Sequence, residues 1–398
     1  MLPDFSSCLR QMADVVVRVG LNLQPGQRLL VHDPYELHGV ARSAEVIVEA
    51  VRAAARTATD HEDPLDVIWS DAARLRDCVE RRVWRALETS LATHATRMQR
   101  TIEHGDALLF LTGTHPRLMA GLPAADVAQA RQIAWECFGP IAQQLTGGAT
   151  NWTCVPAPSP GWAAAAFEFS PAETRLTALW DATFAAFRCQ RLSDPAQPTA
   201  LERWSDHLRA LSQRREALNA ERATGVRYLG AGTDLAVKLP PQHRWCTAQL
   251  TTRRGVPFVA NLPTEEVFTA PDKHSATGVL RTARPLLYAG VAIEDIELEF
   301  SRGEVVRARA GRGEAMLQQL LATDDGARCL GEVALVEPAP AWAAAAPTFQ
   351  HVLFDENAAP HVALGEAYAF CHSGPSHALN RSLLHVDLPL AATATLIR

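Results

Sequence analysis

The chain has 398 residues, 47% of them apolar and 21% charged, and its formal net charge is -6. This length predicts about two domains, and the composition is typical of a folded globular protein. Because the net charge is negative, it gives no long-range attraction to nucleic-acid phosphates, and we expect no nucleic-acid partner. The sequence has no apolar run of roughly 20 residues and no secretion signal, so we expect a cytoplasmic protein without membrane spans.

Eight cysteines are scattered along the chain, without a CxxC pair and without the spacing of a zinc knuckle. We expect these cysteines to be reduced and mostly buried, where a thiol packs as a small apolar group. No disulfide framework is therefore predicted.

The first part of the chain alternates short apolar segments with helical ones, which predicts an open α/β domain over residues 1–190. Its sheet is expected to be parallel, because each strand is separated from the next by a helix. We expect helices at 5–19 and 41–56, and strands at 28–33, 66–71, 107–113 and 152–156.

A polar, proline-bearing stretch at 190–199 predicts a boundary, after which a C-terminal mixed α/β domain is expected over residues 191–398. Gly230-Ala231-Gly232 lies between two strand-like segments and opens no helix, so it is expected to form a turn and not a dinucleotide site. We expect helices at 200–222 and 314–322, and strands within 226–239, 249–259 and 293–311.

His385 and Asp387 stand two residues apart in the strand-like segment LLHVDLPL. Residues two apart in a strand face the same side, so the imidazole and the carboxylate would lie together among apolar neighbours. Such a pair can hold a metal ion. The alternative is a hydrogen-bonded His-Asp pair at the end of a strand.

His361 and Tyr368 are seven residues apart, which corresponds to about 700° of rotation on a helix. We therefore expect a helix that begins just after Pro360 and aims both side chains into one cavity. The alternative is a helix on which the two residues simply complete a core face.

Other acidic residues of the C-terminal half also lie beside apolar segments. Glu265 and Glu266 follow a proline in NLPTEEVFTAPD; one could bind a metal while the other accepts a proton. Glu332 opens the apolar run GEVALV, where an acid is seldom placed without a partner.

Three carboxylates and two imidazoles from these places would balance two divalent cations that share one hydroxide. Oxygen and nitrogen ligands without thiolate suit Zn, Co, Mn or Mg. Two-metal hydrolases hold their ions about 3.5–4 Å apart with a shared water as the nucleophile.

Four segments in this order, NLPTEEVFTAPD, LGEVALV, FDENAAPHVALGEAY and LNRSLLHVDL, resemble the thermophilic metallo-aminopeptidase family. The N-terminal half contributes VGLNLQPGQRLLV and NWTCVPAPSPGWA, and GTDLAVKLP follows, so nearly the whole chain is matched. The resemblance implies cleavage of single residues from the free N-terminus of peptides and a homodimer around an enclosed cavity.

The resemblance also implies which residues hold the metals, and the interval from Glu266 to Glu332 favours Glu266 over Glu265 as a ligand. Tyr368 is implied to lie beside the metals. We expect Glu265 to act as a general base and Tyr368 to donate a hydrogen bond to the developing oxyanion. The implied metal ligands are Glu266, Glu332, His361, His385 and Asp387.

The chain departs from the family after Tyr368: the stretch before His385 looks shortened, and the closing strands after Asp387 are expected to be absent. Two other functions stay open. His361, His385 and Asp387 alone would make the two-His, one-carboxylate set of a mononuclear Fe(II) ring-cleaving dioxygenase. A catalytically inactive homologue with a binding role is the other.

Overall fold

The computed structural model describes residues 5–33, 39–113, 115–190, 197–336, 338–374 and 376–398. The chain forms two compact units, which are described separately. The first unit comprises Met1–Leu122, Gln129–Arg209 and Ala248–Thr264, and the second comprises Pro123–Ala128, Ala210–Thr247 and Glu265–Arg398. The predicted boundary between residues 190 and 191 stays a prediction.

The first unit is built on a parallel sheet, as the alternation of apolar strands and helices predicts. Its strand order is β3-β1-β5-β6, and every neighbouring pair is parallel. All residues of β1 and β5 are buried, which explains why both strands are apolar up to their last residues, His32 and Thr112. The strands are β1 (Leu29–His32), β3 (Leu65–Val67), β5 (Ala107–Thr112) and β6 (Trp152–Pro156), with two small two-stranded sheets, β2 (Val40–Ala41) with β4 (Trp69–Ser70) and β9 (Gln249–Thr251) with β10 (Pro257–Val259).

The helices that cover this sheet bury one apolar stripe each. In α2, for example, Ile47, Val48, Val51 and Ala55 are buried, and this spacing places them on one face. The helix expected at 5–19 is confirmed as α1 followed by one π-helical turn. The longer helices of the chain are α1 (Phe5–Val15), α2 (Glu45–Ala58), α3 (Ala72–Glu80), α4 (Trp84–His104), α5 (Ala124–Thr146), α6 (Pro160–Ala166), α7 (Ala172–Ala186) and α8 (Ala200–Glu221).

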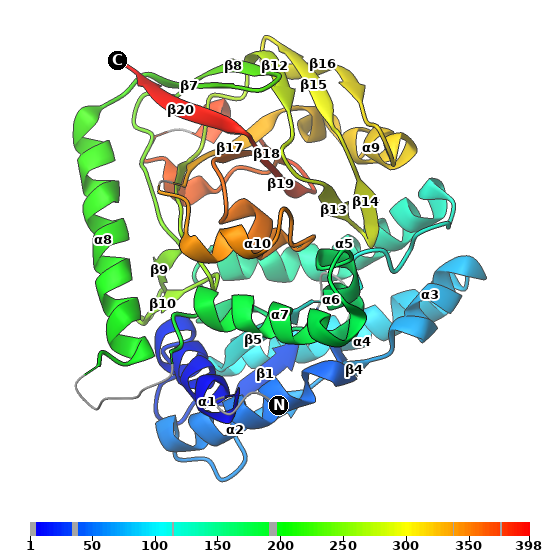
Figure 1. The fold of residues 1–398 in the computed structure, drawn as a ribbon, viewed down its shortest axis with the longest axis vertical. Helices are drawn as coiled ribbons and strands as arrows, with labels where there is room; N and C mark the ends of the chain where they lie inside the picture. The colour runs from blue at the N-terminus through cyan, green and yellow to red at the C-terminus, as the bar shows by residue number, and fades with distance from the viewer. Residues whose placement is uncertain (1–4, 34–38, 114, 191–196, 337, 375) are drawn as a thin grey trace. The chain divides into compact units, whose positions relative to one another are not determined.

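The second unit contains a six-stranded antiparallel sheet in the order β16-β15-β12-β8-β7-β20 (Figure 1). The predicted Gly230–Gly232 turn is confirmed, because it joins β7 to β8 and Gly232 has a φ of +75°. The expectation that no strand follows Asp387 is wrong: β20 pairs with β7 along its whole length. The strands are β7 (Gly225–Gly230), β8 (Thr233–Lys238), β12 (Thr277–Arg281), β15 (Glu297–Ser301), β16 (Glu304–Arg309) and β20 (Ala392–Ile397).

A second antiparallel sheet of this unit, called the site sheet, has the order β11-β17-β18-β19. The helix expected from His361 to Tyr368 is wrong, because His361 begins strand β18 and Tyr368 lies beyond its end. HVALG is wholly buried between two partner strands, and Pro360 stands just before the strand, where no ladder hydrogen bond is lost. The strands are β11 (Val267–Thr269), β17 (Leu330–Leu335), β18 (His361–Gly365) and β19 (His385–Pro389).

The remaining elements of the second unit are short and connect these sheets. They include a hairpin, one two-turn helix that confirms the prediction at 314–322, and several single turns. These elements are β13 (Leu286–Tyr288), β14 (Val291–Ile293), α9 (Glu314–Leu321), η3 (Asp325–Arg328), η4 (Ala341–Ala345), α10 (Val352–Glu356), η5 (Ala369–Cys371) and η6 (Ser376–Ala378).

Tyr228 of β7 links the six-stranded sheet to the site sheet. Its side chain is fully buried, and its hydroxyl is 3.2 Å from the carbonyl oxygen of Ala334 and 3.3 Å from that of His361. Ala334 and His361 are paired across β17 and β18. The hydroxyl therefore holds the site sheet at the residue pair that carries His361.

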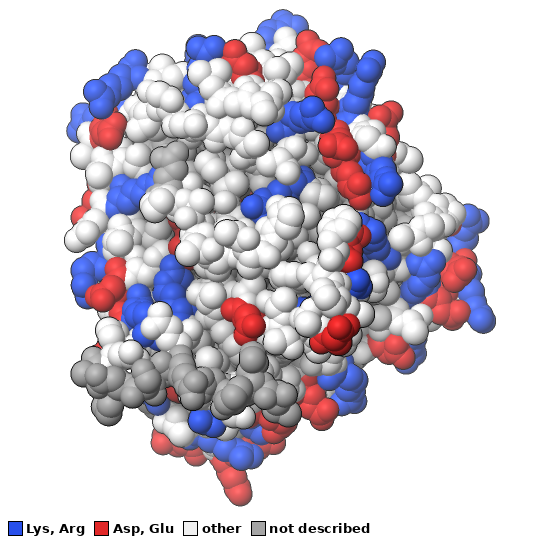
Figure 2. Space-filling model, in the orientation of Figure 1, with Lys and Arg blue, Asp and Glu red and all other residues white. Residues whose placement is uncertain are grey.

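The surface of the protein carries charges of both signs, as the small net charge requires. Figure 2 shows basic and acidic side chains interspersed on the visible face. Among the residues that the structure describes, no helix is long and apolar enough to cross a bilayer.

Asn380 is a buried amide that ties three segments of the second unit together. Its Nδ2 lies 2.7 Å from the Gly326 carbonyl oxygen, 3.2 Å from that of Cys329 and 2.7 Å from that of Gly365. Gly365 ends β18, so this amide also fixes the end of the strand that His361 begins.

We predict that Asn380→Ala lowers the free energy of unfolding by about 2 kcal/mol, because buried carbonyl groups lose their donor. The measurement is the midpoint of urea-induced unfolding, monitored with a signal that comes from the second unit. Asn380→Asp keeps the shape but places a carboxylate among carbonyl oxygens, so it should be at least as destabilising. A midpoint unchanged in both variants would contradict this role.

Candidate functional site

The register of the site sheet brings four predicted residues onto one face. Glu332 is paired with Ala363, and Ala363 with Asp387, so their side chains share a face. His361 and His385 stand two residues before Ala363 and Asp387 on the same strands, which places them on that face as well. The strand expected around His385 and Asp387 is therefore confirmed.

Small residues leave room at the centre of this face. Ala363 lies between Glu332 and Asp387 in the register, and Gly365 is paired with His385. Gly365 has a φ of +101°, and a Cβ there would stand 2.0 Å from the Leu384 carbonyl oxygen, so no larger residue fits. The polar ends of the longer side chains can therefore meet above Ala363.

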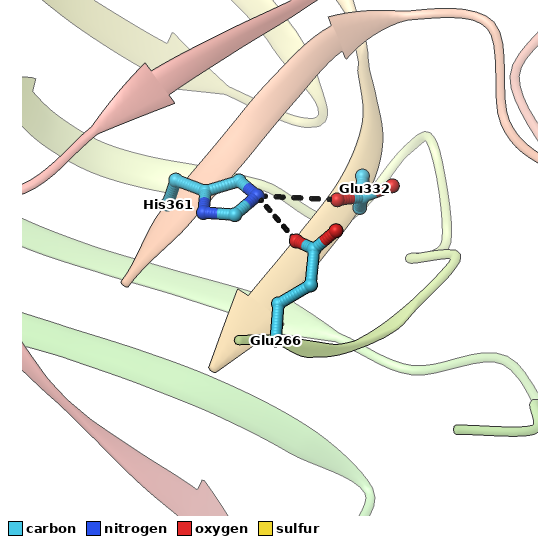
Figure 3. A group of neighbouring side chains, drawn as sticks. All are labelled: Glu266, Glu332 and His361. Atoms are coloured by element: carbon cyan, nitrogen blue, oxygen red, sulfur yellow. Dashed lines mark ion pairs between the residues drawn. The ribbon is translucent and has the colours of Figure 1, made fainter. Parts of the chain in front are cut away.

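Glu266 completes one half of the cluster from the residue just before β11. Figure 3 shows its carboxylate and that of Glu332 on the same side of the His361 ring, both facing Nε2. His361 Nε2 is 3.0 Å from Glu266 Oε2 and 3.4 Å from Glu332 Oε1. All three side chains are 6% exposed or less, so this half is closed to solvent.

Glu332, His385 and Asp387 form the other half of the cluster. His385 Nε2 is 3.8 Å from Glu332 Oε2 and 3.5 Å from Asp387 Oδ1. The side chains of His385 and Asp387 are 20% and 12% exposed, so access is from this half. Glu332 belongs to both groups and gives one carboxylate oxygen to each.

The donor set fits divalent cations. His361 Nδ1 is 3.2 Å from the Ala359 carbonyl oxygen, and His385 Nδ1 is 2.8 Å from that of Glu366. If each Nδ1 carries the proton, each Nε2 lone pair faces the cluster, an orientation typical of metal-binding histidine. With His361 Nε2 unprotonated, buried Glu266 Oε2 has no hydrogen-bond donor within the described chain, although that nitrogen is 3.0 Å away, and a cation would satisfy it.

Burial and like charge displace the pKa values of these groups. Burial raises the pKa of Glu332 to about 7, and the charges of Glu266 and Asp387 add to the rise. Burial opposes the charged form of His385, but the charge of Asp387 and their hydrogen bond prevail and raise its pKa to about 9. Protons therefore hold the cluster together at neutral pH, and cations would have to displace them.

Glu356 is a site residue that sequence reasoning missed. It ends α10, is 5% exposed, and Asn357 Nδ2 donates to its Oε1 at 3.1 Å. Burial and the charge of Asp387 raise its pKa well above the usual range, which places the two carboxyl groups together. A sequence signal existed, because Glu356 stands five residues before His361 in FDENAAPH.

Tyr368 lies against the accessible half of the cluster. Its ring centroid is 4.8 Å from that of His385, and it stacks on Phe370 at 5.2 Å. Phe268 contacts it edge-on at 6.0 Å. Burial, with the charge of Glu332, raises the pKa of Tyr368 well above its ordinary value, so the hydroxyl stays protonated and can donate.

The structure places Glu265 beside the cluster but outside both of its ligand groups. Its Oε1 accepts a hydrogen bond from Trp342 Nε1 at 3.2 Å. Its backbone N–H donates to Asn357 Oδ1 at 2.6 Å, and the same amide bonds Glu356. The role of Glu265 as a base stays a prediction.

Comparison with known proteins identifies the family of this chain. The family model of the thermophilic metalloproteases (M29) matches residues 5–397. Aminopeptidase T of Thermus thermophilus is 38% identical over 391 residues, covering 96% of this chain and 92% of the relative. Aminopeptidase AmpS of Bacillus subtilis is 31% identical over 400 residues, covering 98% of this chain and 94% of the relative.

A solved structure agrees with these sequence relatives. Wild-type AmpT from Thermus thermophilus superposes with a TM-score of 0.82 at 34% sequence identity. The match covers 99% of this chain and 98% of that chain. Since the family model and the relatives span nearly the whole sequence, the resemblance that the sequence motifs indicated is confirmed, and the chain belongs to the M29 family of thermophilic metalloproteases.

Proposed function

We propose that the protein releases the N-terminal residue of peptides, with a hydroxide that bridges two divalent metal ions as the nucleophile. Metallo-aminopeptidase activity follows from membership of the M29 family and from relatives named aminopeptidases. The two-metal form rests on one observation: Glu332 presents its two carboxylate oxygens to two separate ligand groups.

Two sets of ligands follow from that division. Glu266, Glu332 and His361 would hold one cation, and Glu332, His385 and Asp387 would hold the other. The oxygen and nitrogen donors favour Zn, Co, Mn or Mg. When bound, the cations would lower the pKa of a shared water towards neutrality and polarise the scissile carbonyl.

The protein's own side chains would position the peptide and stabilise charge. Tyr368 stays protonated beside His385, so its hydroxyl can donate to an oxyanion that forms at the accessible half of the cluster. Glu265, adjacent to the ligand Glu266, would accept the proton of the attacking water.

Recognition of a free amino end fits the acidic surroundings of the site. Glu356 and Asp387 line a small hollow together with apolar residues, including Leu287, Val352 and Pro389. A substrate ammonium group would meet a carboxylate there. Peptides that lack the ammonium group would lose this contact.

The two other functions that the sequence left open have less support. The iron-dioxygenase set of His361, His385 and Asp387 is not isolated, because Glu266 and Glu332 both lie within 3.4 Å of His361 Nε2. Family membership also favours hydrolysis. An inactive homologue is disfavoured because the whole ligand set is present and adjacent. The homodimer and the cytoplasmic location stay predictions.

We predict that peptides with a free amino end release amino acids while their N-acetylated forms do not. A chelator should abolish release, and Zn or Co should restore it. Metal quantification should find two cations per chain. Equal cleavage of free and acetylated peptides would refute recognition of the amine; one Fe(II) per chain with oxygen consumption would support the dioxygenase instead.

Glu332→Gln should weaken the binding of both cations by roughly 100-fold or more, because one carboxylate serves both ligand groups. The matched control is Glu304→Gln on β16, where the side chain is exposed. This control should retain two cations per chain. Two tightly bound cations in Glu332→Gln, measured by metal analysis after dialysis, would contradict the bridging role.

Tyr368→Phe should lower kcat by about 100-fold with little change in KM, since its hydroxyl would act only where charge develops.

Glu265→Gln should lower kcat by about 100-fold or more and change the acidic limb of the pH profile. If Glu265 only anchors Trp342, its variant will keep the wild-type pH profile, and steady-state kinetics will show it.

A further inference from the structure

Cys246 and Cys371 bring two thiols into contact in the second unit, far apart in the sequence. Cys246 packs against the small apolar cluster that contains Cys371, and its Sγ lies 3.8 Å from the carbonyl oxygen of Phe370, the residue just before Cys371. Their segments are also joined through the backbone, because the Arg244 N–H donates to the Cys371 carbonyl oxygen at 2.8 Å. The two cysteines form no local sequence motif, because their positions are 125 apart in the sequence.

The two thiols differ in exposure and in chemistry. Cys246 is partly exposed, whereas Cys371 is 1% exposed in a small apolar cluster with Phe268 and Ala334. The neighbouring Cys371 thiol lowers the pKa of Cys246, and the charge of Arg244 assists. Burial raises the pKa of Cys371. An accessible thiol backed by a buried second thiol is the arrangement of an attacking and a resolving cysteine.

We propose that Cys246 and Cys371 form a reversible disulfide when the protein meets a hydroperoxide. The Cys246 thiolate attacks the peroxide oxygen, the O–O bond breaks, and hydrogen peroxide leaves one water and a sulfenic acid on Cys246. The Cys371 sulfur then attacks the Cys246 sulfur and expels the hydroxyl group as a second water. The two thiols are oxidised by two electrons, and the peroxide is reduced.

This disulfide would act on Tyr368 and Phe268, the aromatic residues that pack beside the metal-ligand cluster. The Cys371 N–H donates to the Tyr368 carbonyl oxygen at 3.0 Å, and Cys246 is paired through its backbone with Phe268. A disulfide closes the sulfur–sulfur distance to about 2.05 Å and so draws these two segments together. Tyr368, which packs on His385 and Phe268, would shift with its segment.

Other cysteines of the chain provide internal comparisons. Cys8 and Cys189 are both buried in the core of the first unit, and burial raises the pKa of Cys189 far above its ordinary value. A peroxide therefore has no accessible thiolate there. Cys78 is partly exposed on α3 and offers a matched single thiol.

The test treats the zinc-loaded protein with hydrogen peroxide, blocks the remaining thiols and maps the unreduced peptides by mass spectrometry. We expect a linked pair of peptides that contain Cys246 and Cys371, and the link should disappear with dithiothreitol. Turnover of a peptide substrate should fall by about tenfold and recover on reduction. The linked peptides are a readout that does not depend on activity.

Cys246→Ser should abolish both the link and the reversible loss of turnover, whereas Cys78→Ser should behave as the wild type. Cys371→Ala is the second variant, since it keeps an apolar group in the buried position; it too should form no link. The proposal is overturned if no link forms under conditions that oxidise Cys78. Reversible inactivation that persists in Cys246→Ser would overturn it as well.

Discussion

Four carboxyl groups and two imidazoles meet at one small, largely buried face of the site sheet, and the mutual repulsion of the carboxylates is the constraint on which the rest of the site depends. Glu266, Glu332, Glu356 and Asp387 could not all be ionised there without positive charge between them. Without cations, that charge comes from protons, which explains the raised pKa values of both acids and histidines. Two divalent ions would meet the same need and bring a nucleophile with them.

Strand register places these groups more firmly than loops could. The row Glu332, Ala363 and Asp387 runs across three hydrogen-bonded strands, and both histidines sit two residues away along those strands. The Tyr228 hydroxyl donates to the carbonyl groups of the Ala334–His361 pair. The polar cluster is thus held by apolar, hydrogen-bonded strands. The substrate would approach it from the more exposed His385 side.

Part of this arrangement could be read from the sequence because it is local. Alternation in a strand predicts that His385 and Asp387 share a face, and the structure has them on β19. The helix expected from His361 failed because one matching interval of seven residues is not a period, whereas burial between two strands decides the conformation of HVALG. Glu356 was missed, since its neighbour Asp387 is brought near only by the fold. Strand β20 was missed for the same reason: its partner β7 lies at the start of the second unit.

Ala363 has a further consequence. Because Ala363 lies on the strand between those that carry Glu332 and Asp387, the backbone separation of these two acids is set by two interstrand spacings of about 4.8 Å each, not by adjustable side-chain packing. Such a spacing hardly changes with temperature until the ladder itself opens. The metal site would therefore keep its dimensions on heating and would be lost in a single step, when the site sheet unfolds.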